Sequence, residues 1–241
     1  AEHPTQAADW SALGVAGLMP PLAMAYTCDQ GTGSWIPTDE FLARLPHLMR
    51  AFAVPGVGIA VVEDGEVVWS RPFGVTNALT LAPIDSRTIF EDASLSKPVF
   101  AYLVMQLVDQ GLIDLDRPLV QYRRPDYLAE HPWIERITTR DVLRHSTGLP
   151  NWRKSPATEK LVPMVKPGVR IDYSGEALLW LQLALESITG QSLDDSMQKY
   201  LFGPAGMRDS SYTWNANLAA RSVYGHRAHN KPGQGMPPQM F

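Results

Sequence analysis

The spacing of apolar residues between positions 38 and 52 is typical of an amphipathic helix. Thr38 can accept a hydrogen bond from the backbone at the start of this helix, as N-cap residues do. The apolar positions on the buried face are Phe41, Leu45, Leu48, Met49 and Phe52. Pro46 lies inside the pattern and lacks the N–H that a helix interior uses, so we expect it to kink or split the helix.

The segment that follows has the pattern of a β-hairpin. Its arms, residues 57–62 and 67–69, are rich in Val, Ile and Trp, which favour strands. Asp64-Gly65 lies between the arms, and Asp-Gly suits a two-residue hairpin turn in which both positions have positive φ. We therefore expect two antiparallel strands joined at this dipeptide.

Two strongly apolar helices are predicted further along the chain. Residues 99–108 are apolar on nearly every side, which indicates a buried central helix, and Gly111 follows as its C-cap. A second helix is expected from about residue 176 to 188, ending at Gly190. The Pro-rich stretch between them is expected to be irregular, and the chain beyond Gly203 loop-like. A hairpin followed by helices indicates an α+β fold whose sheet is incomplete in this sequence.

Length and composition narrow the class of protein. The chain has 241 residues, 45% of them apolar, which suits one large domain. We expect this domain over residues 37–241, after an N-terminal arm over residues 1–36 that packs on it. Residues 10–25 imitate a signal peptide, but no positive residue precedes them. The net charge of −4, without a basic block, argues against nucleic-acid binding.

Several common sites are excluded by the residues themselves. The single cysteine, Cys28, rules out an intrachain disulfide and a Cys-based zinc site, and no apolar run is long enough to span a bilayer. There is no Gly-x-Ser-x-Gly elbow, phosphate-binding loop or Rossmann fingerprint. His226 and His229 have a metal-like spacing without an obvious third ligand, so we interpret them as solvated loop residues. No metal or cofactor is implied.

Candidate chemistry lies at the start of the first apolar helix, in Ser94-Leu95-Ser96-Lys97. Residues three apart on a helix share a face, so Ser94 and Lys97 can form a nucleophile–base pair. The positive end of the helix would stabilise negative charge on the reacting oxygen, and desolvation by the apolar helix would favour the neutral amine. A second copy, Ser196-Met197-Gln198-Lys199, lies in polar surroundings that indicate an exposed amphipathic helix.

Four stretches of the sequence share their order and spacing with the motifs of one enzyme superfamily. They are Phe90-Glu91-Asp92-Ala93-Ser94-Leu95-Ser96-Lys97 with its apolar helix and residues 109–116, Leu143-Arg144-His145-Ser146-Thr147-Gly148-Leu149-Pro150, Pro167-Gly168 leading to Tyr173-Ser174-Gly175, and Gly203-Pro204-Ala205-Gly206-Met207. On these residues the chain resembles the serine β-lactamase and penicillin-binding-protein superfamily. It is most similar to the branch that holds class C β-lactamases, family VIII esterases and D-aminopeptidases.

The resemblance implies a β-lactamase/transpeptidase-like α+β fold, with an antiparallel sheet flanked by helices and its C-terminal strands missing from this chain. It implies a serine hydrolase that is acylated on Ser94 and needs no metal. Lys97 would share or relay the serine proton, Tyr173 would be the second base, and the backbone N–H of Ser94 would be one oxyanion donor. Ser174 and Gly175 would occupy substrate-binding positions.

Three features depart from the family pattern. Gly175 stands where many members have asparagine, so an amide that would contact the substrate is absent, which favours an esterase or β-lactamase-like activity over a cell-wall peptidase. Pro98 disfavours helical geometry at Lys97, which weakens the expected alignment with Ser94. The last family motif, on a strand that supplies a second oxyanion N–H, is absent. Residues 231–233 imitate it, but we interpret them as a loop because Pro232 cannot donate a ladder hydrogen bond.

These departures leave two other functions open. One is a catalytically impaired or truncated relative that binds a ligand or partner, and the other is a D-Ala-D-Ala carboxypeptidase or aminopeptidase-type peptidase. The expected substrate is a small ester or amide. A lone hairpin is marginally stable, so we expect its missing strands to come from another chain, in a strand-donating partner or homo-oligomer, or from further sequence. The resemblance implies a bacterial protein, either exported or cytoplasmic. His145 is expected to hold its loop.

Overall fold

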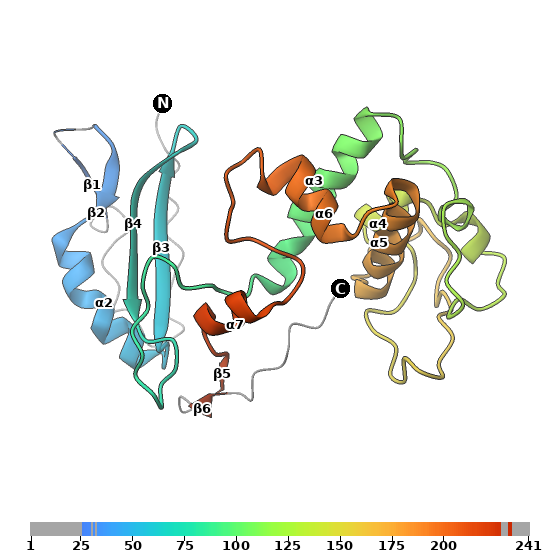
Figure 1. Ribbon diagram of the computed structural model, residues 1–241. Helices are drawn as coiled ribbons and strands as arrows, with labels where there is room; N and C mark the ends of the chain where they lie inside the picture. The colour runs from blue at the N-terminus through green and yellow to red at the C-terminus, as the bar shows by residue number, and fades with distance from the viewer. Residues whose placement is uncertain (1–25, 30, 32, 228–230, 233–241) are drawn as a thin grey trace. The chain divides into compact units, whose positions relative to one another are not determined.

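The computed structural model describes residues 26–29, 31, 33–227 and 231–232 (Figure 1). The described chain forms two compact units, one made of the residues up to Glu91 and those from Asn217 onward, the other of Asp92–Ala216. Helices and small antiparallel sheets occur together, as an α+β fold requires. The signal-like stretch over residues 10–25 lies outside the described residues, and the boundary between arm and domain at residue 37 stays a prediction.

The first unit contains the predicted hairpin. Strands β3 (Gly56–Glu63) and β4 (Glu66–Gly74) pair antiparallel along their full length. Asp64 and Gly65 join them with φ values of 50° and 84°, so both turn residues are left-handed, as the predicted turn requires. The hairpin prediction is therefore confirmed.

Helix α2 (Asp39–Ala51) lies beside this hairpin (Figure 1). The Oγ1 of Thr38 accepts a hydrogen bond from the backbone N–H of Phe41 at 3.1 Å, which confirms the predicted cap. The expected split at Pro46 is wrong, because the helix continues through it. Proline removes one hydrogen bond, whereas the buried side chains of Leu45 and Leu48 on either side keep the helix packed.

Short elements complete the first unit. Strand β1 (Tyr26–Cys28) pairs with β2 (Trp35–Pro37), and β5 (His226–Arg227) pairs with β6 (Lys231–Pro232). The helix α7 (Ala216–Arg221) and the pair β5–β6 lie where the sequence predicted loop, so that expectation is wrong there. Pro232 is tolerated because β6 has a single partner strand among the described residues, and an edge strand leaves room for a residue without an N–H.

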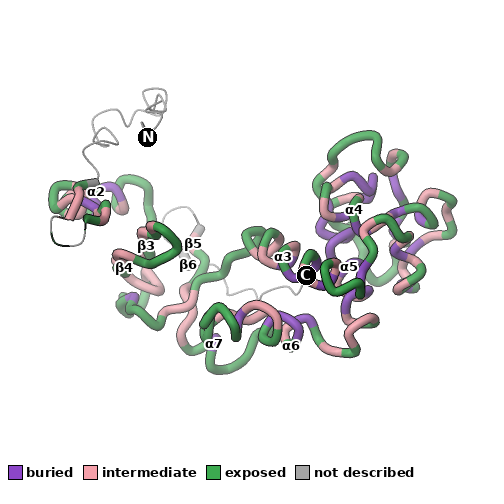
Figure 2. Tube along the Cα trace, turned by 90° about the horizontal axis from the view of Figure 1, so that it is seen from above, coloured by how far each residue is buried: buried purple, intermediate pink, exposed green. Residues whose placement is uncertain are grey.

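The second unit is a helical core. Its main helices are α3 (Ser96–Asp109) and α5 (Gly175–Thr189), which confirm the two predicted apolar helices. They are joined in the core by α6 (Leu193–Met197) and by the single-turn π-helix η5 (Gln198–Phe202). The fully buried side chains on α3 and α5 include Leu103, Val104, Leu107, Trp180, Leu181 and Leu185. Figure 2 shows buried residues gathered around α4 and α5.

The surface of α3 differs from the prediction. Tyr102 is 54% exposed and Met105 is 40% exposed, so the helix is not buried on all sides. An apolar side chain is buried only where a partner covers it, and the pattern of a helix does not say how many of its sides have partners. The predicted ends are confirmed, since Gly111 follows α3 and Gly190 ends α5, both with left-handed φ. Within the described residues no helix has the length and apolar character to cross a bilayer.

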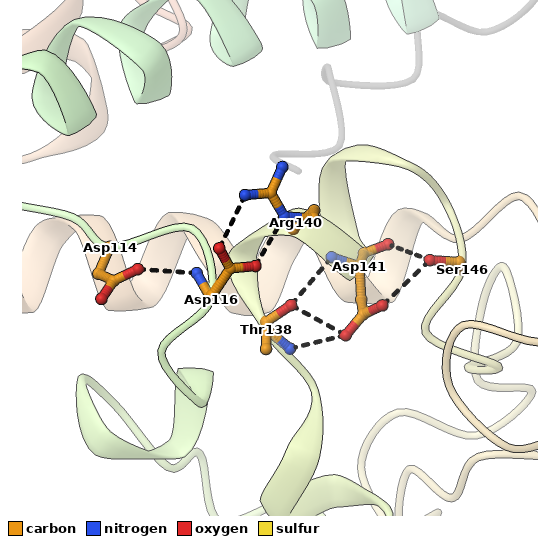
Figure 3. Close-up of polar contacts among 6 residues, drawn as sticks. All are labelled: Asp114, Asp116, Thr138, Arg140, Asp141 and Ser146. Atoms are coloured by element: carbon orange, nitrogen blue, oxygen red, sulfur yellow. Dashed lines mark hydrogen bonds and ion pairs between the residues drawn. The ribbon is translucent and has the colours of Figure 1, made fainter.

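The Pro-rich stretch between α3 and α5 holds only short helices, as predicted. These are η3 (Leu119–Gln121), η4 (Ile134–Arg136) and α4 (Thr139–Leu143). A capping box begins α4, in which Thr138 and Asp141 each satisfy the other's backbone N–H (Figure 3). The same Asp141 carboxylate accepts a hydrogen bond from the hydroxyl of Ser146 at 3.2 Å, which anchors the loop that follows α4.

Candidate active site

Ser94 lies in a 3₁₀ turn, η2 (Ala93–Leu95), directly before α3. Residues i and i+3 of a 3₁₀ turn eclipse each other, and the Nζ of Lys97 donates to the Oγ of Ser94 at 3.1 Å. The expected disturbance by Pro98 is therefore wrong. Pro98 lies in the first turn of α3, where the backbone N–H has no partner inside the helix in any case.

Tyr173 reaches the same serine from the segment before α5. Its Oη lies 2.8 Å from the Oγ of Ser94, although the two residues are 79 positions apart. The Nζ of Lys97 also lies 5.1 Å from the centre of the Tyr173 ring. The three side chains expected to react thus form one hydrogen-bonded group inside the second unit. Because Lys97 donates to the serine oxygen, the serine hydrogen is available to Tyr173.

The surroundings of Tyr173 have opposing effects on the pKa of its phenol. Partial burial raises the pKa of the Tyr173 phenol, whereas hydrogen bonds to Lys97 and Ser94 and the positive charge of Lys97 lower it. The net result is a pKa below the ordinary value of 10.0. A phenolate at this position is therefore easier to form than on a free tyrosine.

His145 supports the Tyr173 ring. The two rings stack with centres 4.6 Å apart, and the backbone N–H of Ser174 donates to Nδ1 of His145 at 3.2 Å. Burial, with a smaller contribution from the charge of Lys97, lowers the pKa of His145, which favours the neutral ring that this acceptor role requires. The geometry agrees with the expected structural role.

Two non-glycine residues around the group have left-handed backbone. Ala93, directly before Ser94, has φ 44°, and His145 has φ 53°. This conformation costs about 1–2 kcal/mol for a residue with a Cβ. Such strain persists only where surrounding contacts enforce it, and it is common at functional sites.

Ser174 does not fit the expected substrate contact. Its side chain is buried, and its hydroxyl accepts from the N–H of Ala177 at 3.1 Å and donates to the carbonyl of Pro150 at 2.8 Å. The hydroxyl therefore caps α5 and holds the neighbouring loop, so it has no free donor for a substrate. A sequence pattern does not distinguish these two roles, because Ser is equally suited to a helix cap and to a binding site.

Gly175 lies against two residues, Asn151 and Trp152, that the sequence pattern did not assign to the site. Its backbone N–H donates to the Oδ1 of Asn151 at 2.9 Å. A Cβ added at Gly175 would lie only 2.5 Å from the ring of Trp152. The only hint in the sequence is Gly175 itself, because a glycine leaves a space that another side chain must fill. The glycine does not show that Trp152 fills this space.

The second Ser-x-x-Lys copy is unlike the first. Ser196 is fully buried in α6, so the expectation of an exposed helix is wrong for this residue. Its Oγ has no hydrogen-bond partner among the described residues. Lys199 lies in the following π-turn with its Nζ over the ring of Tyr200. Ser196 is buried because its helix packs in the core through Leu193 and Met197.

The histidines near the chain end do not form a metal site in the described part of the molecule. The Nε2 of His226 accepts a hydrogen bond from the backbone N–H of Ala78 at 3.0 Å. His229 lies outside the described residues. Among the residues that the structure describes, no three His, Cys, Asp or Glu side chains gather as a metal would require.

Comparison with solved structures confirms the β-lactamase/transpeptidase-like fold. A class C beta-lactamase matches with a TM-score of 0.68 at 22% identity, over 78% of this chain and 54% of that one. A penicillin-binding protein homologue from Pyrococcus abyssi, described as octameric, matches with a TM-score of 0.68 at 24% identity, over 81% of this chain and 50% of that one.

Curated relatives agree with the structures. Penicillin-binding protein 4* of Bacillus subtilis is 25% identical over 68% of this chain and 39% of its own length. A D-aminopeptidase of Cereibacter sphaeroides is 28% identical over 81% of this chain and 40% of its own length. The chain thus spans well under half of these two relatives. The sequence pattern of the Beta-lactamase family matches residues 42–240. On this match, which covers most of its length, the chain belongs to the beta-lactamase family.

Proposed function

We propose that this protein is a serine hydrolase that forms an acyl-enzyme on Ser94. The observation that carries the proposal is the contact of one serine oxygen with both Lys97, at 3.1 Å, and Tyr173, at 2.8 Å. A serine hydroxyl is a weak nucleophile until a neighbouring group takes its proton. A phenol with a lowered pKa, next to an ammonium group, is suited to that task.

In the first half of the reaction, the Oγ of Ser94 attacks the carbonyl carbon of an ester or amide. Its proton passes to the phenolate of Tyr173, and the ammonium of Lys97 stabilises the negative charge before the transfer. The bond to the leaving group then breaks, and that alcohol or amine takes the proton from Tyr173. In the second half, water attacks the ester on Ser94 in the same manner and releases the acid.

The developing oxyanion needs hydrogen-bond donors. Ser94 precedes α3, so its backbone N–H is a candidate donor at the positive end of that helix. One such donor is typically worth about 3–4 kcal/mol of the barrier. We assign esters, and β-lactams as strained amides, as the substrate class, since Gly175 supplies no side-chain amide to bind an unstrained peptide.

The test uses the full chain and three reagents. A small alkyl fluorophosphonate should add one probe mass to the intact protein, and peptide mapping should locate it on Ser94. A nitrophenyl acetate and a chromogenic cephalosporin should be hydrolysed with turnover. Labelling without turnover of any ester or β-lactam would contradict hydrolysis and favour an impaired relative, and absence of labelling would contradict the acyl-enzyme itself.

Replacing Tyr173 by phenylalanine is expected to lower kcat/KM for an ester about 10²-fold, because the general base is lost while the Lys97 ammonium still lies beside the serine oxygen. The base acts in its deprotonated form, so the wild-type rate should rise as pH increases through the pKa of Tyr173. Because that pKa is lowered, the rise should occur below the pH at which a free tyrosine ionises. The pH profile of kcat/KM measures both effects, and an unchanged profile in Tyr173→Phe would contradict this role.

A further inference from the structure

The indole of Trp152 fills the space beside position 175. A Cβ built on Gly175 would lie 2.5 Å from both Cη2 and Cζ2 of this ring. Real Cβ atoms do not approach other atoms so closely, so the ring can occupy this place only because residue 175 has no side chain. The missing side chain of Gly175 is therefore replaced by an aromatic one from another segment.

Position 175, which this ring fills, lies two residues from the reacting phenol of Tyr173. Ser174, between the two residues, is extended, with φ −137° and ψ 113°. Side chains two apart in extended backbone point to the same face. A Cβ on Gly175 would therefore point to about the same side of the chain as the side chain of Tyr173, and the indole occupies that direction.

Trp152 is held by its two neighbours in sequence. Asn151 accepts from the N–H of Gly175 through its side chain, at 2.9 Å, and from the N–H of Glu176 through its carbonyl, at 3.0 Å. Arg153 donates to the carboxylate of Glu176 through its backbone N–H and its Nε, both at 3.0 Å. The backbone on both sides of the tryptophan is therefore fixed to the first turn of α5.

The fixed ring is also accessible. Trp152 is 51% exposed, and Tyr173 is 45% exposed. A large flat apolar surface that is both rigid and open binds apolar groups at little cost in conformational entropy. Aromatic rings gain further from offset or edge-to-face contact with an indole.

We propose that Trp152 is a specificity-determining residue whose indole forms an apolar wall of the substrate site. The wall selects esters and strained amides that carry an aromatic ring over those with small aliphatic groups. This inference rests on the proposed acylation of Ser94, and it adds the chemical class of substrate that the site prefers. Gly175 is the complementary residue, since any side chain there would displace the ring.

The test measures kcat/KM for two pairs of esters. One pair, nitrophenyl phenylacetate and nitrophenyl acetate, varies the acyl group, and the other, phenyl acetate and ethyl acetate, varies the leaving group. Trp152→Ala should lower the aromatic-over-aliphatic ratio about tenfold in at least one pair, whereas Trp152→Phe should retain most of it. Comparing ratios between variants cancels the intrinsic reactivity of the esters. Ratios unchanged in both pairs would overturn the inference.

Two controls separate this inference from the proposed function. Trp35→Ala removes a half-exposed tryptophan from the other unit and should leave both ratios as in the parent. A small alkyl fluorophosphonate should still label Ser94 in Trp152→Ala, because that probe has no ring to place against the wall. If the parent itself is not labelled, the proposed function fails. If all variants are labelled and the aromatic preference persists without Trp152, only the specificity assignment fails.

Discussion

Replacing Ser94 by alanine is expected to abolish covalent labelling and to lower kcat for ester hydrolysis by about 10⁴-fold or more. The alanine variant keeps the fold, because Ser94 lies on an exposed turn and, among the described residues, its side chain bonds only to the site residues Lys97 and Tyr173. Those two groups remain close together but have no oxygen to activate. Intact-protein mass after fluorophosphonate treatment and the initial rate with nitrophenyl acetate measure the two effects.

The chain offers a matched control in its second Ser-x-x-Lys copy. Ser196→Ala alters a serine that lies three positions before a lysine, as Ser94 does. This serine is buried, and its hydroxyl has no partner among the described residues. Labelling and turnover should be unchanged, and stability unchanged or slightly higher, since a buried hydroxyl without a partner is costly. Labelling that survives in Ser94→Ala, or is lost in Ser196→Ala, would place the nucleophile elsewhere.

The two serines illustrate which features a sequence can predict. Features set by neighbouring residues were predicted correctly, because the atoms that decide them lie within a few positions. Thr38 at the start of α2, the left-handed turn at Asp64-Gly65 and the end of α5 at Gly190 all belong to this kind. Each depends on local backbone geometry and needs no knowledge of the rest of the fold.

Features that depend on distant partners were predicted less well. Ser196 was expected on an exposed helix but is buried, whereas Tyr102 was expected in the core but is half exposed. Pro46 was expected to kink or split α2, but the helix continues through it, because packing compensates for the missing hydrogen bond. Burial is decided by what covers a side chain, and a local pattern does not contain that information.

The site combines both kinds of feature. The spacing of Ser94 and Lys97 could be interpreted from the chain alone, because one turn of backbone sets it. Tyr173 was assigned only through the family resemblance, since no local rule links residues 79 positions apart. Trp152 was missed altogether, because its place depends on the close approach of two segments at Gly175.

Removing the carboxylate of Glu176 should cause the largest loss of stability. Its ion pair with Arg153 is almost completely buried, with the side chains 3% and 7% exposed. The guanidinium also lies 4.0 Å from the centre of the Tyr127 ring, and burial, with a smaller effect of Glu176, raises the pKa of that phenol to about 12. Glu176→Ala leaves a buried cation beside a neutral ring, so we expect the free energy of unfolding to fall by about 4 kcal/mol.

Urea unfolding followed by circular dichroism measures this loss. The exposed pair of Arg140 and Asp116 is the control, since it has two short hydrogen bonds, at 2.7 and 2.8 Å, but lies in solvent (Figure 3). Asp116→Ala should leave the urea midpoint nearly unchanged. The double variant Arg153→Met with Glu176→Leu should be more stable than Glu176→Ala, because no unpaired charge stays buried. Equal losses from the buried and the exposed pair would contradict the argument.

The same ion pair connects stability to specificity. The carboxylate of Glu176 accepts from the backbone and the side chain of Arg153, and this fixes one side of Trp152. Under conditions where Glu176→Ala is still folded, the indole should lose its fixed position while Ser94, Lys97 and Tyr173 keep their mutual contacts. The variant should therefore be labelled by a small fluorophosphonate like the parent, yet show a weaker preference for aromatic esters. A pair that only stabilised the fold would leave that preference intact.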